Sequence, residues 1–365
     1  MVAWSPERSV LAACTMAFFA TMVARLVISP VVPAIAEDFA VSNALIGLAL
    51  SGLWVAYALA QFPSGLLGDR FGERAVILVA VGGTGLASLL LALAPVFPVF
   101  VLCTVLLGGA AGLHFSVATT LLSRTFQNTG TAIGIHSTGA PLAGLLAPVA
   151  AAYAGTIFGW RYAIALGAVV ALPVLVLVAR SIEPTEPLRP GEPMAERLAG
   201  GPLLELLSRP PIAGTLAISV LAAFVWQGTA SFLPTFLIEH RGFSEPMAGA
   251  VFSAYFVVQG VGQPGMGWLS DRVGREPAMA VCMVAGVAGY GLYVLGPGLA
   301  SVLLATALVG VAMSWGAALL PKFLDHMSSE EEGVGFGLAR TSYMVFGATG
   351  SVGVGLLADT FDWGR

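Results

Sequence analysis

Four ionisable residues lie inside long apolar runs of this sequence, and each is basic or can become so: Arg25, His114, His136 and Arg340. Ionisable side chains are expensive to place within a membrane-spanning segment, so such residues are functional candidates by default. A guanidinium group stays charged at physiological pH and can hold a carboxylate or phosphate in two parallel hydrogen bonds. Since no Asp or Glu lies deep in an apolar run, the pattern predicts a positively charged cavity for a small anion.

Each of these residues also has a structural alternative. Arg25 could bond a backbone carbonyl or a helix C-terminus, and His114 could be a neutral packing residue that bonds a neighbouring helix. His136 and Arg340 lie closer to the ends of their runs, from where long side chains can reach the membrane interface. Because histidine titrates near neutral pH, His114 could instead bind a proton together with the anion.

The elements that position these residues are expected to be membrane-spanning helices. Hydrophobic residues make up 57% of the 365 and charged residues 10%, whereas a soluble chain is about half apolar and about one-quarter charged. A helix needs about 20 apolar residues to cross the hydrocarbon core. The sequence has eleven such runs, at residues 9–35, 44–67, 75–96, 98–123, 131–157, 162–180, 211–238, 247–269, 277–296, 298–321 and 334–358. The predicted fold class is an all-α polytopic membrane protein.

A segment rich in Pro, Glu and Arg divides these runs into two groups. The prediction is an N-terminal bundle of six helices at 1–180, a linker at 181–210 and a C-terminal bundle of five helices at 211–365. Trp363 corresponds to Trp160, which precedes a complete sixth run. A twelfth helix is therefore expected to be missing, through truncation or because the sequence is a fragment, with a genuine eleven-helix protein as the alternative.

A charged loop motif occurs once in each group. The first copy reads "GLLGDRFGER" at 65–74 and the second "GWLSDRVGRE" at 267–276. Its charged residues and glycines are Asp69, Arg70, Gly72 and Arg74 in the first copy, and Asp271, Arg272, Gly274 and Arg275 in the second. With a cytoplasmic N-terminus, both copies and most other basic residues fall on the cytoplasmic side, as expected for a protein of the plasma membrane.

Several other kinds of function are excluded by pattern. The net charge of −4, without a basic cluster, gives no footprint for nucleic acid. No His or Cys spacing suits a metal, and no nucleophile–base pair suits an enzyme. The string "GVGQPG" at 260–265 matches a dinucleotide fingerprint but lies inside an apolar run, so no cofactor is expected.

The doubled motif, the repeat of six helices and the long central linker resemble the major facilitator superfamily of secondary transporters. The resemblance implies two parallel repeats, alternating access and a substrate site near the membrane midplane. It also implies that runs one, four, seven and ten line the cavity, with runs two, five, eight and eleven beside them. Further substrate-binding candidates are Trp226, Gln227, Trp315 and Tyr343, although Trp and Tyr equally often serve ordinary helix packing.

The same resemblance assigns a conformational gate to the two motif loops. Asp69 would be a latch of the outward-facing state that docks near the start of the eleventh run, with Asp271 as its weaker counterpart. The alternative is a solvated turn set by Gly72, whose charges serve only topology. The expected partners are a small-molecule substrate, protons and the lipid bilayer, and the chain is expected to be a monomer.

Two other functions remain open beside anion transport. The string "GAPLAG" at 139–144 approximates the Gly-Pro motif of drug:proton antiporters, and in such an exporter Arg25 would be structural. An inactive membrane scaffold is the further alternative if the chain is truncated.

The distribution of basic residues generates a prediction about topology. A cysteine introduced at Gly191, in the predicted linker, should react with a membrane-impermeant thiol reagent only after cells are permeabilised, because the linker is expected in the cytoplasm. Labelling in intact cells would reverse the predicted orientation.

Overall fold

The structure consists of helices and their connections. It is a computed structural model that describes residues 6–127, 132, 135–187, 201–327, 332–361 and 363, with no strand among them. Ten helical segments within these residues are long and apolar enough to cross a membrane. The predicted all-α polytopic membrane fold is therefore confirmed.

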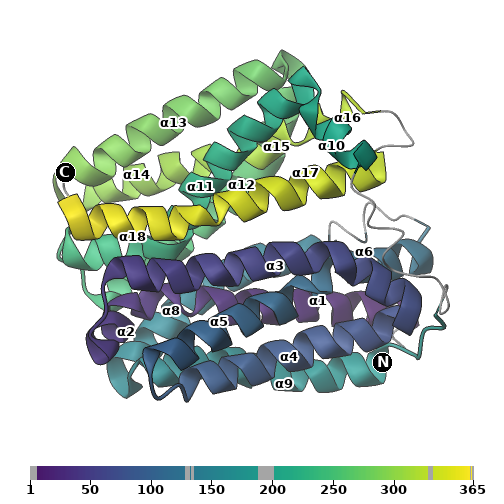
Figure 1. Ribbon diagram of the computed structural model, residues 1–365. Helices are drawn as coiled ribbons and strands as arrows, with labels where there is room; N and C mark the ends of the chain where they lie inside the picture. The colour runs from purple at the N-terminus through teal and green to yellow at the C-terminus, as the bar shows by residue number, and fades with distance from the viewer. Residues whose placement is uncertain are drawn as a thin grey trace, which may run out of the picture.

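The helices form two groups that lie side by side (Figure 1). The first group contains α1 (Pro6–Leu26), η1 (Ser29–Val31), α2 (Val32–Phe39), α3 (Asn43–Phe71), α4 (Glu73–Ala92), α5 (Phe97–Gly112), α6 (His114–Thr125), α8 (Gly139–Phe158) and α9 (Trp160–Ser181). The second group contains α10 (Gly201–Ser208), α11 (Pro210–Glu239), α12 (Glu245–Val273), α13 (Arg275–Leu295), α14 (Gly298–Ala312), α15 (Trp315–Leu319), α16 (Pro321–Leu324), α17 (Glu332–Gly347) and α18 (Thr349–Phe361).

One predicted membrane run is a long helix that falls outside the ten. This is α12, which spans 29 residues but contains several Gly, Gln, Pro and Ser residues that lower its hydropathy. It packs against α8 of the first group and α14 of the second. Because it lies between other helices, α12 needs a less apolar surface than a helix that faces lipid on most sides.

Four predicted runs are each divided into shorter helices. The run at 9–35 becomes α1, η1 and α2, because Pro30 and Pro33 are the second residues of η1 and α2 and cannot donate a helical backbone hydrogen bond. The runs at 98–123, 298–321 and 334–358 are interrupted at Leu113, at Met313 and near Ala348.

Side chains from neighbouring helices compensate two of these interruptions. Ser64 of α3 donates a hydrogen bond to the carbonyl of Leu113, and the Nε2 of Gln259 of α12 donates one to the carbonyl of Met313 at 3.0 Å. A backbone carbonyl freed inside a membrane is costly unless it has a donor. In each group, therefore, a side chain from a neighbouring helix donates to the carbonyl at the corresponding break.

A short helix lies inside the segment that was predicted to be entirely linker. This is α10, whose Leu206 is buried in a small cluster with Ile212 and Phe323. The apolar side chain of Leu206 explains the difference, since it stabilises a helix against the second group. Residues 188–200 of the predicted linker lie outside the described part of the chain, and the predicted boundaries of the two bundles and the linker stay a prediction.

The two groups are joined at one end of the molecule, where α2 ends and α3 begins. We call this the Asp38 end, and the opposite end, where α3 meets α4, the Asp69 end. At the Asp38 end, Ser29 donates a hydrogen bond to the carbonyl of Ser231 at 2.7 Å, and Ser51 donates one to that of Ala348 at 2.7 Å. Toward the Asp69 end the helices of the two groups diverge (Figure 1).

Helices α3 and α18 make the tightest of these contacts. A side chain at Gly355 would collide with the backbone of Asn43, so a small residue is needed for this close approach. At the same place, the Asp359 carboxylate accepts hydrogen bonds from the backbone N–H groups of Asn43 (3.0 Å) and Ala44 (2.7 Å). A carboxylate of the second group thus caps the N-terminus of a helix of the first, where the helix dipole favours negative charge.

This cap generates a prediction about conformation. Asp359→Asn should weaken the closed Asp38 end by about 1 kcal/mol, typical of a lost exposed cap, and so open it about 5-fold more often. The measurement is the rate at which a thiol reagent labels a cysteine at the buried position Ala348, in a chain with the native cysteines replaced.

The matched control is Asp38→Asn. Asp38 forms a 3.0 Å ion pair with Arg161 at the same end, but both residues belong to the first group. The same change of charge there should leave the labelling rate unaltered. Equal labelling in wild type and Asp359→Asn would show that the cap does not hold the groups together.

Candidate functional site

A central cleft of about 470 Å³ lies between the two groups of helices. One wall comes from α1 and the start of α8, and the other from α11, α12 and the segment at α15. Most lining groups are apolar, and the polar ones are Ser137 and Thr138 on the first side and Gln259 and Gln263 on the second. The cleft therefore combines an apolar surface with a few hydrogen-bonding groups, as ligand sites commonly do.

Arg25 lies behind one wall of this cleft, in the last turn of α1, with 4% of its surface exposed. Its Nε donates to the carbonyl of Thr21 at 3.0 Å, and Nη2 lies 2.7 Å from the sulfur of Met22, a residue that lines the cleft. The guanidinium lies 4.0 Å from the ring centre of Tyr57 and 5.0 Å from that of Trp54. The aromatic faces stabilise the cation without neutralising it.

No carboxylate in the described part of the chain forms an ion pair with Arg25. The predicted alternative, a bond to a backbone carbonyl, is also present through Thr21. That bond occupies Nε and leaves the charge unpaired. The structure is therefore compatible both with a structural role for Arg25 and with a role in binding an anion.

Aromatic contacts connect Arg25 to the predicted residues of the second group. Trp54 packs edge-to-face on Trp226 across the two groups, with ring centres 5.4 Å apart, and Trp226 itself lines the cleft. Trp315 and Tyr343 form a similar pair at 5.7 Å. Gln227 is 2% exposed, and its side-chain oxygen lacks a hydrogen-bond partner in the described structure.

Arg340 reaches from α17 toward the first group. Its guanidinium lies 5.0 Å from the ring centre of Phe115, and its buried Nε has no hydrogen-bond partner among the described residues. Tyr343 lies within electrostatic reach of both Arg340 and Tyr57. The two arginines are thus connected through aromatic residues, one on each side of the cleft.

His114 and His136 form a second buried cluster next to these residues. Both are fully buried, and their ring centres are 5.4 Å apart. Phe18 packs on both rings, at 6.1 Å from His114 and 5.1 Å from His136. The backbone of Cys14 lies within hydrogen-bonding reach of both rings, although none of the four ring nitrogens has a well-aligned hydrogen bond with a described residue.

Several contributors to this region were not among the predicted site residues. They are Trp54 and Tyr57 of α3, and Phe115 of α6. Trp54 and Tyr57 are three residues apart, a spacing that places both side chains on one face of a helix. The sequence shows this spacing, but no sequence pattern indicates that this face of the helix packs against Arg25.

The first copy of the loop motif forms a network within its own group. Arg124 at the end of α6 makes an ion pair with Glu73 and lies 3.9 Å from Asp69. Gly72 has a φ of 84° at the junction of α3 and α4, a conformation that favours glycine. The backbone N–H of Arg74 donates to the hydroxyl of Thr185 at 3.0 Å.

The second copy forms a comparable network with other partners. Arg275 makes ion pairs with Asp271 at 2.6 Å and with Asp325 at 3.3 Å, while Lys322 pairs with Glu276 at 2.6 Å. Gly274 repeats the positive φ, at 98°.

The remaining motif arginines contact aromatic rings. Arg70 lies 5.5 Å from the ring centre of Phe71, and Arg272 lies 4.4 Å from that of Trp268. The ion pair of Asp69 with Arg124 stays within the first group. The role of these residues as a gate stays a prediction.

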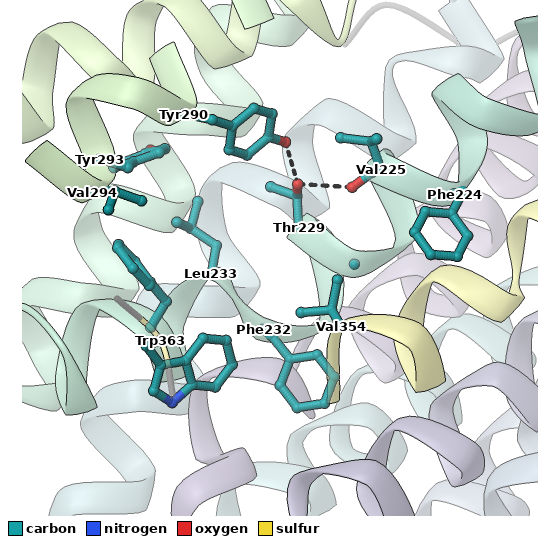
Figure 2. A pocket seen from close by; sticks show the side chains of 12 residues that line it. Phe224, Val225, Thr229, Phe232, Leu233, Tyr290, Tyr293, Val294, Val354 and Trp363 are labelled. Atoms are coloured by element: carbon teal, nitrogen blue, oxygen red, sulfur yellow. Dashed lines mark hydrogen bonds between the residues drawn. The ribbon is translucent and has the colours of Figure 1, made fainter. Parts of the chain in front are cut away.

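A second cavity of about 260 Å³ lies within the second group, between α11, α13 and α18 (Figure 2). Phenylalanine, tyrosine and tryptophan side chains dominate its walls, and no charged residue of the described chain lines it. Its polar feature is a hydrogen bond between Thr229 and Tyr290, which Figure 2 shows together with that of Thr229 to the carbonyl of Val225. This cavity is separate from the arginine and histidine cluster.

A membrane bundle of two similar helix groups around a central cleft, closed at one end, defines the fold of a secondary transporter. The chain belongs to the Major Facilitator Superfamily, whose family model matches residues 14–247 and 216–364. The resemblance predicted from the repeated motif is thereby confirmed.

Known relatives and a solved structure agree with this assignment. The chain is 23% identical to a hexuronate transporter of Bacillus subtilis (strain 168), over 70% of this chain and 62% of that protein. It is 26% identical to a gallate transporter of Pseudomonas putida, over 77% of this chain and 69% of that protein. A bacterial homologue of the human lysosomal transporter Spinster, solved in an inward-facing, unoccupied conformation, superposes with a TM-score of 0.83 at 18% identity, covering 98% of this chain and 84% of that one.

The motif networks generate a prediction about the gate. If Asp69 holds the Asp69 end closed in the other conformation, Asp69→Asn should favour opening at this end. A charge-assisted contact of about 1–3 kcal/mol corresponds to a change of about 5- to 150-fold in the population ratio. The measurement is thiol labelling of a cysteine at Ser137, which lines the cleft.

Asp271→Asn is the matched variant in the second copy. The side chain of Asp271 is 71% exposed, against 23% for Asp69, so its loss should change labelling less. If neither variant alters labelling, the loops serve topology only.

Proposed function

We propose that the chain is a secondary active transporter that works by alternating access and carries a small anion. The observation that carries this proposal is the charge of Arg25, which is 4% exposed and has no ion-pair partner among the described residues. An unpaired buried charge is costly. An anionic substrate supplies the missing partner while it occupies the cleft.

The positions of the basic groups suit such a ligand. Arg25 and Arg340 approach the interface from opposite groups, and Arg340 has a buried, unpartnered N–H. A guanidinium can hold a carboxylate in two parallel hydrogen bonds. His114 begins α6, where the helix dipole also favours negative charge.

Two of the relatives support a carboxylate in particular. A hexuronate and gallate, the substrates in the names of the two relatives, each carry a carboxylate beside several hydroxyl groups. Gln259, Gln263, Ser137 and Thr138 line the cleft and can bond hydroxyl groups. A small polyhydroxylated carboxylate is therefore the favoured substrate class.

The conformation fits one stage of alternating access. The groups are bonded at the Asp38 end and diverge toward the Asp69 end. With the N-terminus in the cytoplasm and the chain in the plasma membrane, as its basic residues predict, this is an inward-open state of a monomer. Breaking the Asp359 cap and closing the Asp69 end would give the outward-open state.

Export of apolar compounds is the second candidate function. It is favoured by the largely apolar lining of the central cleft and by Pro141, within "GAPLAG", which lines it. In that case Arg25 would serve only to hold α1 against α3.

Substitution of Arg25 separates the two functions. Arg25→Lys keeps the charge but loses the planar fork, so the apparent affinity for gallate or galacturonate should fall by about tenfold or more. Arg25→Ala should nearly abolish uptake into proteoliposomes at equal protein level. Thermal stabilisation of the purified wild type by the same anions is the accompanying measurement.

Arg161→Lys is the matched control. Arg161 also lies against an aromatic ring, 4.3 Å from the ring centre of Trp160, but at the Asp38 end and paired with Asp38. Its substitution should leave anion affinity unchanged. If the Arg25 variants export hydrophobic cations normally and no anion stabilises the wild type, the exporter interpretation replaces the anion transporter.

A further inference from the structure

We propose that His114 and His136 form one proton-binding site that holds a single proton between them, and that occupancy of this site is coupled to anion binding at Arg25 and Arg340. The coupling rests on the proposed function, whereas the proton site itself rests on the geometry of the two rings. The site makes the transporter a symporter of an anion with a proton.

The two histidines stand out because they are two titratable side chains that lie against each other in the interior. Each is fully buried, and neither nitrogen of either ring meets hydrogen-bond geometry with a described residue. A neutral imidazole that serves only packing would normally donate its one N–H to a carbonyl. Two adjacent imidazoles without a side-chain partner among the described residues therefore offer ring nitrogens that can bind a proton.

The geometry of the two rings suits a proton. The ring centres are 5.4 Å apart and inclined by 55°, and Phe18 and Phe115 pack on the rings at 5.1 to 6.1 Å. The described chain has no group of three or more metal-ligating side chains. Each neutral imidazole already carries one N–H, and a proton that adds to the other nitrogen of one ring gives that ring a second N–H, which can donate to the lone pair of its neighbour. A second proton would place two cations in contact, so only one is held.

The surrounding charges make the proton dependent on the anion. Two arginines lie near the pair. Arg25 of α1 acts electrostatically on His114, and Arg340 of α17 packs on Phe115, which contacts the ring of His136; the backbone of Cys14 in α1 lies beside both rings. On α4, Glu73 is engaged by Arg124. Without an anion, an imidazolium adds a positive charge near two arginines, which disfavours it. A bound anion removes that repulsion.

Coupling between two sites is reciprocal. If the anion raises the proton affinity of the pair, protonation of the pair raises the affinity for the anion by the same factor. The anion and the proton therefore enter together, and they leave together when the cleft opens at the other end. Among the described residues the spans contribute no carboxylate beside Arg25, so the histidine pair takes the place that an acidic residue would otherwise occupy.

The proton site can be tested on the purified full chain. The sequence has four histidines, and the other two, His240 and His326, are exposed. Isotope-labelled imidazole signals would be followed by NMR between about pH 8 and about pH 4, the range that brackets histidine titration. His114→Gln and His136→Gln are the test variants, and His240→Gln and His326→Gln are the matched controls. Thermal unfolding shows which variants remain folded.

The coupling is tested by adding gallate to weakly buffered protein. We expect uptake of about one proton per gallate bound, and a gallate affinity that rises by up to about tenfold per unit decrease in pH where the pair titrates. Either test variant should abolish the uptake, while both controls retain it. Binding of gallate without proton uptake overturns the coupling.

Failure of the anion proposal is distinguishable from failure of the proton site. If neither gallate nor galacturonate binds, the proposed function fails. The NMR titration alone then decides whether His114 and His136 share a proton. A shared midpoint for the two rings that His136→Gln removes supports the site. Rings that stay neutral over the whole range, or that titrate independently, overturn it.

Discussion

The charge of Arg25 is the constraint on which the central region depends. A guanidinium inside a membrane bundle must find its hydrogen-bond partners without water. Arg25 donates to groups of its own helix, and the aromatic rings of Trp54 and Tyr57 stabilise its positive charge. Trp54 then contacts Trp226 of the second group, so the residues that stabilise the cation also join the two groups. A substitution of Arg25 should therefore affect the contact between the two groups as well as ligand binding.

Interrupted helices position most of the residues around this charge. Arg25 precedes the end of α1, His114 follows the break at Leu113, and Trp315 follows the break at Met313. Inside a membrane, irregular backbone is tolerated only where neighbouring groups satisfy it. Ser64 and Gln259 do so.

The sequence predicts the helices well because apolar length is a local property. It does not predict where they break, because the breaks at Leu113 and Met313 depend on donors from helices far away in the chain. For the site, Arg25, Arg340 and Trp226 could be identified by type and depth. Tyr57 could not, because its position below the guanidinium follows from how α3 packs on α1 and not from any local pattern.

The two motif copies end in opposite order, Glu73-Arg74 in the first and Arg275-Glu276 in the second. Their ion pairs are reversed in the same way: an acidic residue at the start of α4 binds Arg124, whereas a basic residue at the start of α13 binds Asp325. Each junction therefore keeps an ion pair inside its own group, and the exchange of sign between the copies reverses only which partner carries the positive charge.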